Sequence, residues 1–363
     1  MNIVCWGTGK VAQRIMNNSS IVEQYNILLF IDSDITKKGL LFHGYEIKTP
    51  NALYSLKSEA TIVILTSENS YYEIKKIIEE MNIAIDIKIE NRYFFSKMKV
   101  LSKYSNSKDK EIKEIVYFLQ HRSLDVFNYT FKDKYTELNS DVIYNKKFNL
   151  FYVNHNGRKL FFSKKFNSID KVISYYRGLL IEQDKESPHK YLDRGFDING
   201  GDIVIDAGAA EGFFSLDIID KVSKVYLIEC DDLWIEALKH TFEPYKDKVV
   251  IIKKYLSDID DGEYTTLDSL VDEPVNFIKM DIEGSECDAL LGAKKIMSLS
   301  KNIKCSICSY HRKFDEIVIK HTLESFGFIH SNTKGYMWFP YRSENEELPT
   351  DLRRGVVRAW KKD

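Results

Sequence analysis

The sequence is poor in several features that mark secreted or nucleic-acid-binding proteins. It holds 6 prolines and 5 cysteines among 363 residues, and its formal net charge is −2 at pH 7. An odd number of scattered cysteines does not resemble a disulfide framework, so we expect reduced thiols. A nearly neutral charge balance argues against nucleic acid as a partner.

Long hydrophobic runs are also missing. No window approaches the roughly 20 apolar residues that span a bilayer, and no basic segment followed by an apolar run and a cleavage site opens the chain. We therefore expect no membrane span and a cytoplasmic location. The abundance of Lys, Ile, Asn and Tyr suggests an AT-rich bacterial genome. At 44% hydrophobic and 29% charged residues, the chain is long enough for two domains with separate cores.

The most informative segment is VIDAGAAEG, residues 204–212. It predicts a buried strand that ends in a tight turn of small residues and then opens a helix. Backbone N–H groups in such a turn can approach a ligand, and side chains at Gly208 or Gly212 would obstruct them. The anionic Asp206 suits an ammonium or sulfonium group, and S-adenosylmethionine carries both. The cofactor residues that we predict in this segment are Asp206, Gly208, Ala209, Glu211 and Gly212.

Two further apolar strands end in acids. The strand at 225–229 ends in Glu229, about 20 residues after the turn, where a βαβ unit presents a carboxylate to ribose hydroxyls. The strand at 275–280 runs into Asp281 and Glu283. We predict that Asp206 and Glu229, at two strand ends, contact the same nucleoside, and that Asp281 also belongs to the cofactor site. Capping of the following helices is the alternative role for these acids.

Together these motifs resemble the FkbM family of S-adenosylmethionine-dependent methyltransferases, over about residues 191–327. The resemblance rests on GDIVIDAGA at 201–209, Glu229, TLD at 266–268 and IKMDIEGSE at 278–286. It implies a class I methyltransferase-type, doubly wound Rossmann-like sheet and, usually, a hydroxyl acceptor on a sugar or secondary metabolite. One departure is Ala210, where broader methyltransferase patterns often carry glycine.

Methyl transfer to a hydroxyl requires alignment of the acceptor oxygen with the methyl group and removal of a proton. Asp281 and Glu283 are candidate catalytic residues, because ligands bind at the carboxyl edge of an open α/β sheet. His311 is a third candidate, since it directly follows the strand at 303–310.

Several residues are predicted to bind the acceptor. The resemblance implies that the segment 186–191 folds over the cleft, which brings in His189 and Tyr191; a helix beginning at Pro188 is the alternative. Arg312 belongs to a Tyr-His-Arg cluster at a strand exit. Arg353 and Arg354 form a solvated basic face or grip a phosphate or carboxylate of the acceptor.

A metal site is not predicted. Cys305, Cys308 and His311 have a Cys-x-x-Cys-x-x-His spacing, but on an extended strand the two cysteines point to opposite faces. Magnesium bound by Asp281, Glu283 and Glu286 is conceivable. Capping of the following helix is the more economical role for these acids.

The first 98 residues predict a second, smaller Rossmann-like domain. A strand at 2–6 leads into a Gly-x-Gly-x-x-Ala turn that contains Gly7 and Gly9, and a strand at 26–31 ends at Asp32. These residues resemble the nucleotide-binding modules beside sugar-modifying enzymes, which implies a nucleotide, dinucleotide or sugar nucleotide as ligand. A degenerate unit that only packs or dimerises remains open. An NAD-dependent oxidoreductase or epimerase is the alternative enzyme class, through this domain.

Between the two domains we expect a helical connector at 99–144, followed by a methyltransferase domain at 145–363 that begins with a hairpin around residues 154–157. A last strand is expected at 335–339. The predicted activity is methylation of a hydroxyl on a sugar or glycan precursor in bacterial surface-glycan biosynthesis. Methylation of a nitrogen acceptor and formation of a homo-oligomer both remain open.

Overall fold

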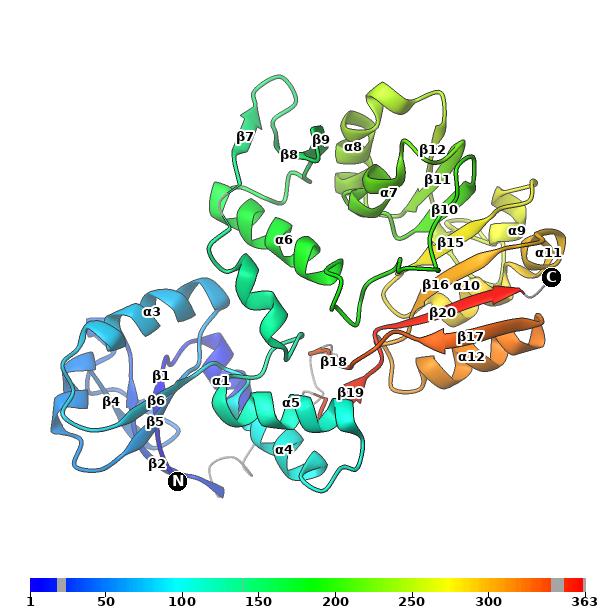
Figure 1. Ribbon diagram of the computed structural model, residues 1–363. Coiled ribbons are helices and arrows are strands. Elements are labelled where there is room, and N and C mark those ends of the chain that lie inside the picture. Colours follow the sequence, from blue (N-terminus) through cyan, green and yellow to red (C-terminus); the bar gives the residue numbers. More distant parts are fainter. Residues whose placement is uncertain (18–23, 139, 341–348, 362–363) are drawn as a thin grey trace. The chain divides into compact units, whose positions relative to one another are not determined.

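The computed structural model describes residues 1–17, 24–138, 140–340 and 349–361. The chain divides into two compact units, one built on Met1–Asn128 and one built on Tyr129–Ser343 and Asp351–Asp363 (Figure 1). Within the described ranges, no helix has the length and apolar character needed to cross a membrane.

The first unit contains a six-stranded sheet in the order β3-β4-β2-β1-β5-β6. All neighbouring strands are parallel except β3 and β4. This sheet confirms the predicted α/β pattern, including its first strand and the helix that follows it. The strands are β1 (Asn2–Trp6), β2 (Asn26–Ile31), β3 (Leu41–Phe42), β4 (Tyr45–Lys48), β5 (Ala60–Ile64) and β6 (Ile87–Glu90).

Four α-helices accompany this sheet in the described part of the first unit. They are α1 (Lys10–Met16), α3 (Glu68–Glu80), α4 (Phe94–Tyr104) and α5 (Lys110–His121). The last two pack against each other and fall largely in the predicted connector. Their apolar faces are partly buried, with Ile115 and Leu119 inaccessible, which is why this charged stretch is helical. The boundary between the units falls after Asn128.

The second unit is organised around a seven-stranded sheet in the order β12-β11-β10-β15-β16-β20-β17. Strands β12 to β16 in this order are parallel, and β20 is antiparallel to both of its neighbours. This is the predicted doubly wound sheet. Its strands are β10 (Ile203–Ala207), β11 (Lys224–Glu229), β12 (Val249–Lys253), β15 (Phe277–Met280), β16 (Lys304–Cys308), β17 (Phe328–Asn332) and β20 (Val356–Lys361).

The central strands of this sheet are buried and mostly apolar, although β10 contains Asp206 and β15 contains Lys279. The chain leaves β10 toward β11 on one side, and β15 lies on the other side of β10, so the winding direction reverses between β10 and β15. Ligands of open α/β sheets bind outside the carboxyl ends of the strands at such a point. The helices of this part are α7 (Phe213–Ile218), α8 (Asp232–Thr241), α9 (Leu267–Leu270), α10 (Glu286–Leu291), α11 (Lys294–Leu299) and α12 (Asp315–Ser325).

Smaller elements complete the second unit. The predicted hairpin is present, as β8 (Leu150–His155) and β9 (Arg158–Phe161), with β7 (Val142–Asn145) beside β8. Two small pairs are β13 (Tyr255–Leu256) with β14 (Tyr264–Thr265) and β18 (Met337–Trp338) with β19 (Leu352–Arg353).

Two local predictions are wrong. The segment at 335–339 is not the last strand: β18 pairs with β19 outside the large sheet, and β20 follows both. No helix begins at Pro188, because α6 (Ile169–Glu182) ends earlier and the chain from Gln183 to Lys190 forms turns.

Candidate functional site

The turn after β10 satisfies its own backbone groups. Gly208 N and Ala209 N both donate to Ile228 O, at 2.9 and 3.2 Å, and Ala210 N donates to Glu229 Oε2 at 2.9 Å. The prediction that these N–H groups point at a ligand is therefore wrong for these three residues. They instead tie the end of β10 to the end of β11.

The two glycines of the turn are needed for close packing within the protein. Gly208 has φ +74°, and a Cβ there would lie 1.8 Å from the carbonyl oxygen of Asp281. Gly212 has φ +85°, and a Cβ there would lie 2.5 Å from the Phe242 ring. Glycine thus lets the turn approach the end of β15 and lets α7 approach α8, a different reason from the predicted access of a ligand.

Asp206 faces the interior, not a ligand. Its side chain has no exposed surface; Oδ1 lies 2.9 Å from Lys279 Nζ, and Oδ2 accepts a hydrogen bond from Ser215 Oγ at 2.7 Å. Lys279 Nζ also donates to Gly208 O at 2.5 Å. The predicted direct contact between Asp206 and a sulfonium is therefore corrected: this buried pair fixes β10, β15 and the turn relative to one another.

A cavity of about 430 Å³ opens at the carboxyl ends of β10, β11 and β15. Among the predicted site residues, Gly208, Glu229, Asp281 and Glu283 line it. Glu229 Oε1 accepts from the backbone N–H groups of Cys230 and Asp231, at 2.8 and 2.9 Å, so its carboxylate is held in place. The lining residues that were not predicted as site residues are Ala210, Ile228, Cys230, Asp231, Trp234, Lys254, Tyr255, Leu256, Ile282 and Ser285.

Four predicted cofactor residues of the second unit lie off the lining of this cavity: Asp206 and Gly212, described above, and Ala209 and Glu211. Glu211 is 4% exposed and accepts a hydrogen bond from Tyr175 Oη at 2.8 Å. Burial raises the pKa of Glu211 to about 7, although the hydrogen bond from Tyr175 acts in the opposite direction. Ala209 is 4% exposed, so its part in the turn is structural.

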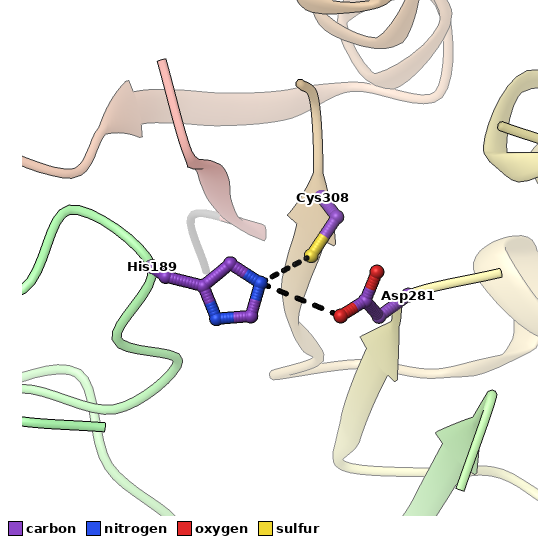
Figure 2. Close-up of side chains that lie close together, drawn as sticks. All are labelled: His189, Asp281 and Cys308. Carbon is purple, nitrogen blue, oxygen red and sulfur yellow. Dashed lines mark hydrogen bonds and ion pairs between the residues drawn. The ribbon is translucent and has the colours of Figure 1, made fainter. Parts of the chain in front are cut away.

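Asp281 is the centre of a polar cluster at the end of β15. Tyr191 Oη donates to Asp281 Oδ2 at 2.8 Å and Tyr310 Oη to Oδ1 at 3.2 Å. His189 Nε2 lies 3.4 Å from Oδ2, as Figure 2 shows. Burial alone would raise the pKa of Asp281, but His189, His311 and Lys279 outweigh it and hold this pKa well below its usual value. The structure thus brings Asp281 next to Tyr191, which lies 90 residues earlier in the sequence, and next to His189 in the same earlier segment.

His311 lies on another side of Asp281 and is 4% exposed. Its Nδ1 is 3.0 Å from Glu286 Oε1, and its Nε2 is 3.4 Å from Asp281 Oδ1 and 3.6 Å from Glu283 Oε2. Burial lowers the pKa of His311, but these three carboxylates raise it to about 9. The raised pKa favours the protonated ring of His311, which argues against its predicted part as the proton acceptor.

Glu283 differs from the other two catalytic candidates in its exposure. Its side chain is 79% exposed, and its backbone has φ 57°, which is uncommon for a residue with a side chain. Backbone strain of this kind clusters at functional sites. Glu283 lines the cavity and is the only one of the three candidates that solvent reaches freely.

The predicted arginines have mainly structural contacts. Arg353 Nη1 donates to the carbonyl oxygens of Tyr310 and His311, at 2.7 and 2.8 Å. Arg354 Nη1 donates to Gly335 O at 3.0 Å, and its guanidinium lies over the Tyr336 ring. The pair does not form one bidentate grip, because the two side chains reach different loops. Arg312 is exposed beside Gly284.

In the first unit, the predicted nucleotide residues are engaged by the protein. Gly7 N donates to Ile31 O at 2.7 Å. Asp32 accepts four hydrogen bonds, from Thr8 N, Thr8 Oγ1, Asp34 N and Lys37 Nζ, at 2.5 to 3.0 Å. A carboxylate offers about four lone-pair positions, so a ribose hydroxyl would have to displace one of these donors. At Gly9, a methyl group would meet nothing within 4 Å.

Sequence reasoning gave no cofactor or acceptor role to several residues of the second unit's site, although it weighed Cys308 and Glu286 as metal ligands and noted Tyr310 beside His311. Lys279, Cys308, Glu286 and Tyr310 all point into the cluster around Asp281 or support it. The one available signal was a lysine inside the otherwise apolar strand 275–280, since a buried lysine needs a partner.

Comparison with known proteins assigns the two ends of the chain to different domains. Residues 256–336 match the methyltransferase FkbM domain, and residues 1–89 match a domain described as C2185-like, N-terminal. The FkbM resemblance of the C-terminal part is thereby confirmed; the predicted nucleotide-binding class of the N-terminal part is not. No curated protein matches the chain.

Solved structures with a similar fold are distant in sequence. Methyltransferase FkbM from Methylobacillus flagellatus KT is 16% identical with a TM-score of 0.46, over 99% of this chain and 89% of its own. A putative methyltransferase from Streptococcus mutans in complex with SAH is 15% identical with a TM-score of 0.32, over 46% and 91%. Magnesium protoporphyrin IX methyltransferase from Synechocystis PCC 6803 with bound SAM is 13% identical with a TM-score of 0.32, over 45% and 71%.

Proposed function

We propose that the second unit transfers a methyl group from S-adenosylmethionine to a hydroxyl of a sugar or glycan precursor. The observation that carries this proposal is the 430 Å³ cavity at the ends of β10, β11 and β15, in a chain that matches a methyltransferase domain. Its volume falls in the range of about 300–1,000 Å³ that small-molecule sites occupy. Glu229 at the end of β11 and Asp281 after β15 stand on either side of β10 and both line it.

Each part of the cavity suits one part of the cofactor. Glu229 is held by three backbone N–H groups and accepts hydrogen bonds from the ribose hydroxyls with its remaining lone pairs. Trp234, Tyr255 and Leu256 supply the apolar and aromatic surface for adenine. Asp281 then lies toward the sulfonium end of the cofactor.

Methyl transfer needs an acceptor oxygen in line with the bond between sulfur and the methyl carbon. The oxygen forms a bond to carbon, the carbon–sulfur bond breaks with its electron pair on sulfur, and the acceptor proton leaves to a base. Glu283 is placed for that proton, because it lines the cavity and reaches solvent. Alignment alone supplies on the order of 7 kcal/mol or more of the barrier reduction.

A sugar-like acceptor is supported by the mixture of aromatic rings and hydroxyls beside Asp281. Tyr191 and Tyr310 donate to Asp281, and the Phe339 ring lies 4.8 Å from the Tyr310 ring. Such apolar walls with a few fixed polar groups orient small polar ligands. A role in surface-glycan biosynthesis follows as part of the same proposal, with a nitrogen acceptor as the competing outcome.

Calorimetry with S-adenosylhomocysteine tests the cofactor site. We expect binding by the full chain and a loss of at least tenfold in affinity in Glu229→Ala. Glu236→Ala is the matched control, since Glu236 lies on α8, pairs with Lys164 and does not line the cavity. Absence of binding by the unmodified chain, or equal binding by Glu229→Ala, contradicts the proposal.

Mass spectrometry of products tests the acceptor class. Incubation with S-adenosylmethionine and a panel of sugar nucleotides, free sugars and amino sugars should give products in which a methyl group replaces a hydroxyl hydrogen. Methylation of only amines or only non-carbohydrate compounds contradicts the acceptor assignment and leaves the cofactor assignment standing.

A further inference from the structure

Three side chains of different ligand chemistry converge next to the cavity. Figure 2 shows His189, Asp281 and Cys308 pointing toward one another from the turn segment before β10, the end of β15 and the end of β16. His189 Nε2 lies 3.4 Å from Asp281 Oδ2 and 3.6 Å from Cys308 Sγ. One ligand atom from each residue lies within 4.8 Å of the other two.

These distances are too long for strong hydrogen bonds and match the edges of a zinc site. A charge-assisted bond between an imidazole and a carboxylate measures about 2.7–2.9 Å. Zinc binds nitrogen at about 2.0–2.1 Å, oxygen at about 2.0–2.2 Å and sulfur at about 2.3 Å, so a tetrahedral site has edges of about 3.3–3.6 Å. His189 Nε2 also lies 3.2 Å from Tyr310 Oη, and one imidazole N–H cannot make good hydrogen bonds to a carboxylate, a thiol and a hydroxyl at once, whereas a cation can be shared by nitrogen, carboxylate and thiolate.

The surroundings hold the three ligands in place. His189 and Cys308 are 1% and 0% exposed, so neither samples many rotamers. Tyr310 Oη donates to Asp281 Oδ1 and Tyr191 Oη to Oδ2, which fixes the plane of the carboxylate. Hydrogen bonds of this kind around a ligating carboxylate are typical of metal sites.

The strand geometry separates this cluster from the Cys-x-x-Cys-x-x-His spacing in the sequence. Cys305 packs in the hydrophobic cluster with Ile278 and Ile307, whereas Cys308, three residues later, reaches His189. His311 binds Glu286 through Nδ1. The Cys-x-x-Cys-x-x-His spacing therefore does not identify the residues near Cys308, because these residues come from distant segments.

We propose that His189 Nε2, Asp281 Oδ2 and Cys308 Sγ bind one zinc ion whose fourth position receives the acceptor hydroxyl. Three protein ligands with one open position are the arrangement of catalytic zinc sites. Asp281 lines the cavity and keeps 19% of its side chain exposed, so the open position is reached from the cavity. This inference rests on the proposed methyl transfer only for the identity of that fourth ligand.

The zinc ion would act on the acceptor before methyl transfer. A hydroxyl oxygen bound to zinc would lose its proton to Glu283 more easily, because the cation would stabilise the alkoxide. The alkoxide oxygen then forms its bond to the methyl carbon, the carbon–sulfur bond breaks with its electron pair on sulfur, and the ether oxygen leaves the metal. Zinc keeps its charge throughout, so no oxidant or reductant is needed.

Cobalt substitution tests the site without any measurement of activity. The full chain is stripped of metal and titrated with Co²⁺ alone, and we expect about one ion per chain with the near-ultraviolet absorption band that a thiolate–cobalt bond produces. Cys308→Ala should lose this band. Cys305→Ala is the matched control and should retain it, since this thiol lies on the same strand in the apolar core.

His189→Gln provides a second variant if Cys308→Ala does not fold, and it should weaken Co²⁺ binding at least tenfold. No thiolate band in the unmodified chain, or a band that persists in Cys308→Ala, overturns the proposal. Binding of S-adenosylhomocysteine is measured on the same samples. Cofactor binding without cobalt binding refutes the metal site alone, and the reverse result refutes the methyltransferase assignment alone.

Discussion

Replacement of Glu211 by glutamine should remove a specific pH dependence of stability. Burial raises the pKa of Glu211 from 4.5 to about 7 in the folded protein, even though Tyr175 donates to its carboxylate. The folded state then holds a proton that the unfolded state has already lost. Because the folded protein binds more protons between these two values, stability decreases as pH rises through this range.

The size of the effect follows from the two pKa values. One pKa unit corresponds to about 1.36 kcal/mol, so the difference between 4.5 and about 7 amounts to about 3 kcal/mol in full. As pH rises from about 5 to about 8, we expect the unfolding free energy of the Glu211→Gln variant to increase by about 2–3 kcal/mol relative to that of the unmodified chain. Glutamine is neutral at both pH values, and its side-chain oxygen can still accept the hydrogen bond from Tyr175.

Urea unfolding at several pH values, followed by tryptophan fluorescence, measures this difference. Trp234, Trp338 and Trp360 all belong to the second unit and report mainly on it. Glu236→Gln serves as the control, because this carboxylate is partly exposed and should show no such trend. Parallel pH profiles for the unmodified chain and Glu211→Gln would refute the assignment of a buried, largely protonated Glu211.

Three further substitutions test the packing around the two sheets. Gly208→Ala should abolish S-adenosylhomocysteine binding and lower the melting temperature. The control Gly201→Ala, also at positive φ but facing open space, should lower the unfolding free energy by only about 1–2 kcal/mol. Equal losses of stability by calorimetry would contradict the close approach of Gly208 to β15. Lys279→Met should destabilise the second unit by about 3–5 kcal/mol in urea unfolding, because Asp206 would remain buried without its cation, and Asp206→Asn in the same background should recover part of that loss. Asp32→Asn should lower the melting temperature of the full chain, since this carboxylate accepts four hydrogen bonds. A large stabilisation of the unmodified chain by a nicotinamide dinucleotide would contradict a structural role for Asp32.

Local sequence pattern determined most of the secondary structure and the edge of the sheet where the site lies. Apolar runs such as those at 203–207 and 277–280 form strands because both faces of the sheet are covered. The acids at the ends of β11 and β15, Glu229 and Asp281, line the cavity because parallel strands end at one edge. The methyltransferase domain was recognisable from the same short motifs.

The direction in which each polar group points was decided by tertiary structure. Asp206 and Glu211 are acidic residues like Glu229, yet they turn inward to Lys279 and Tyr175. Nothing in their sequence neighbourhood distinguishes them, because burial depends on which distant strand or helix packs against each position.

Convergence of distant segments was likewise invisible in the sequence. His189 and Cys308 are 119 residues apart, and they meet only because the turn before β10 lies against the end of β16. The two side chains can act together with Asp281 because His189 Nε2 lies 3.4 Å from Asp281 Oδ2. The sequence by itself determined the sheet and its methyltransferase character; the tertiary packing decided which charges are buried, which histidine is protonated and which three side chains can share a metal ion.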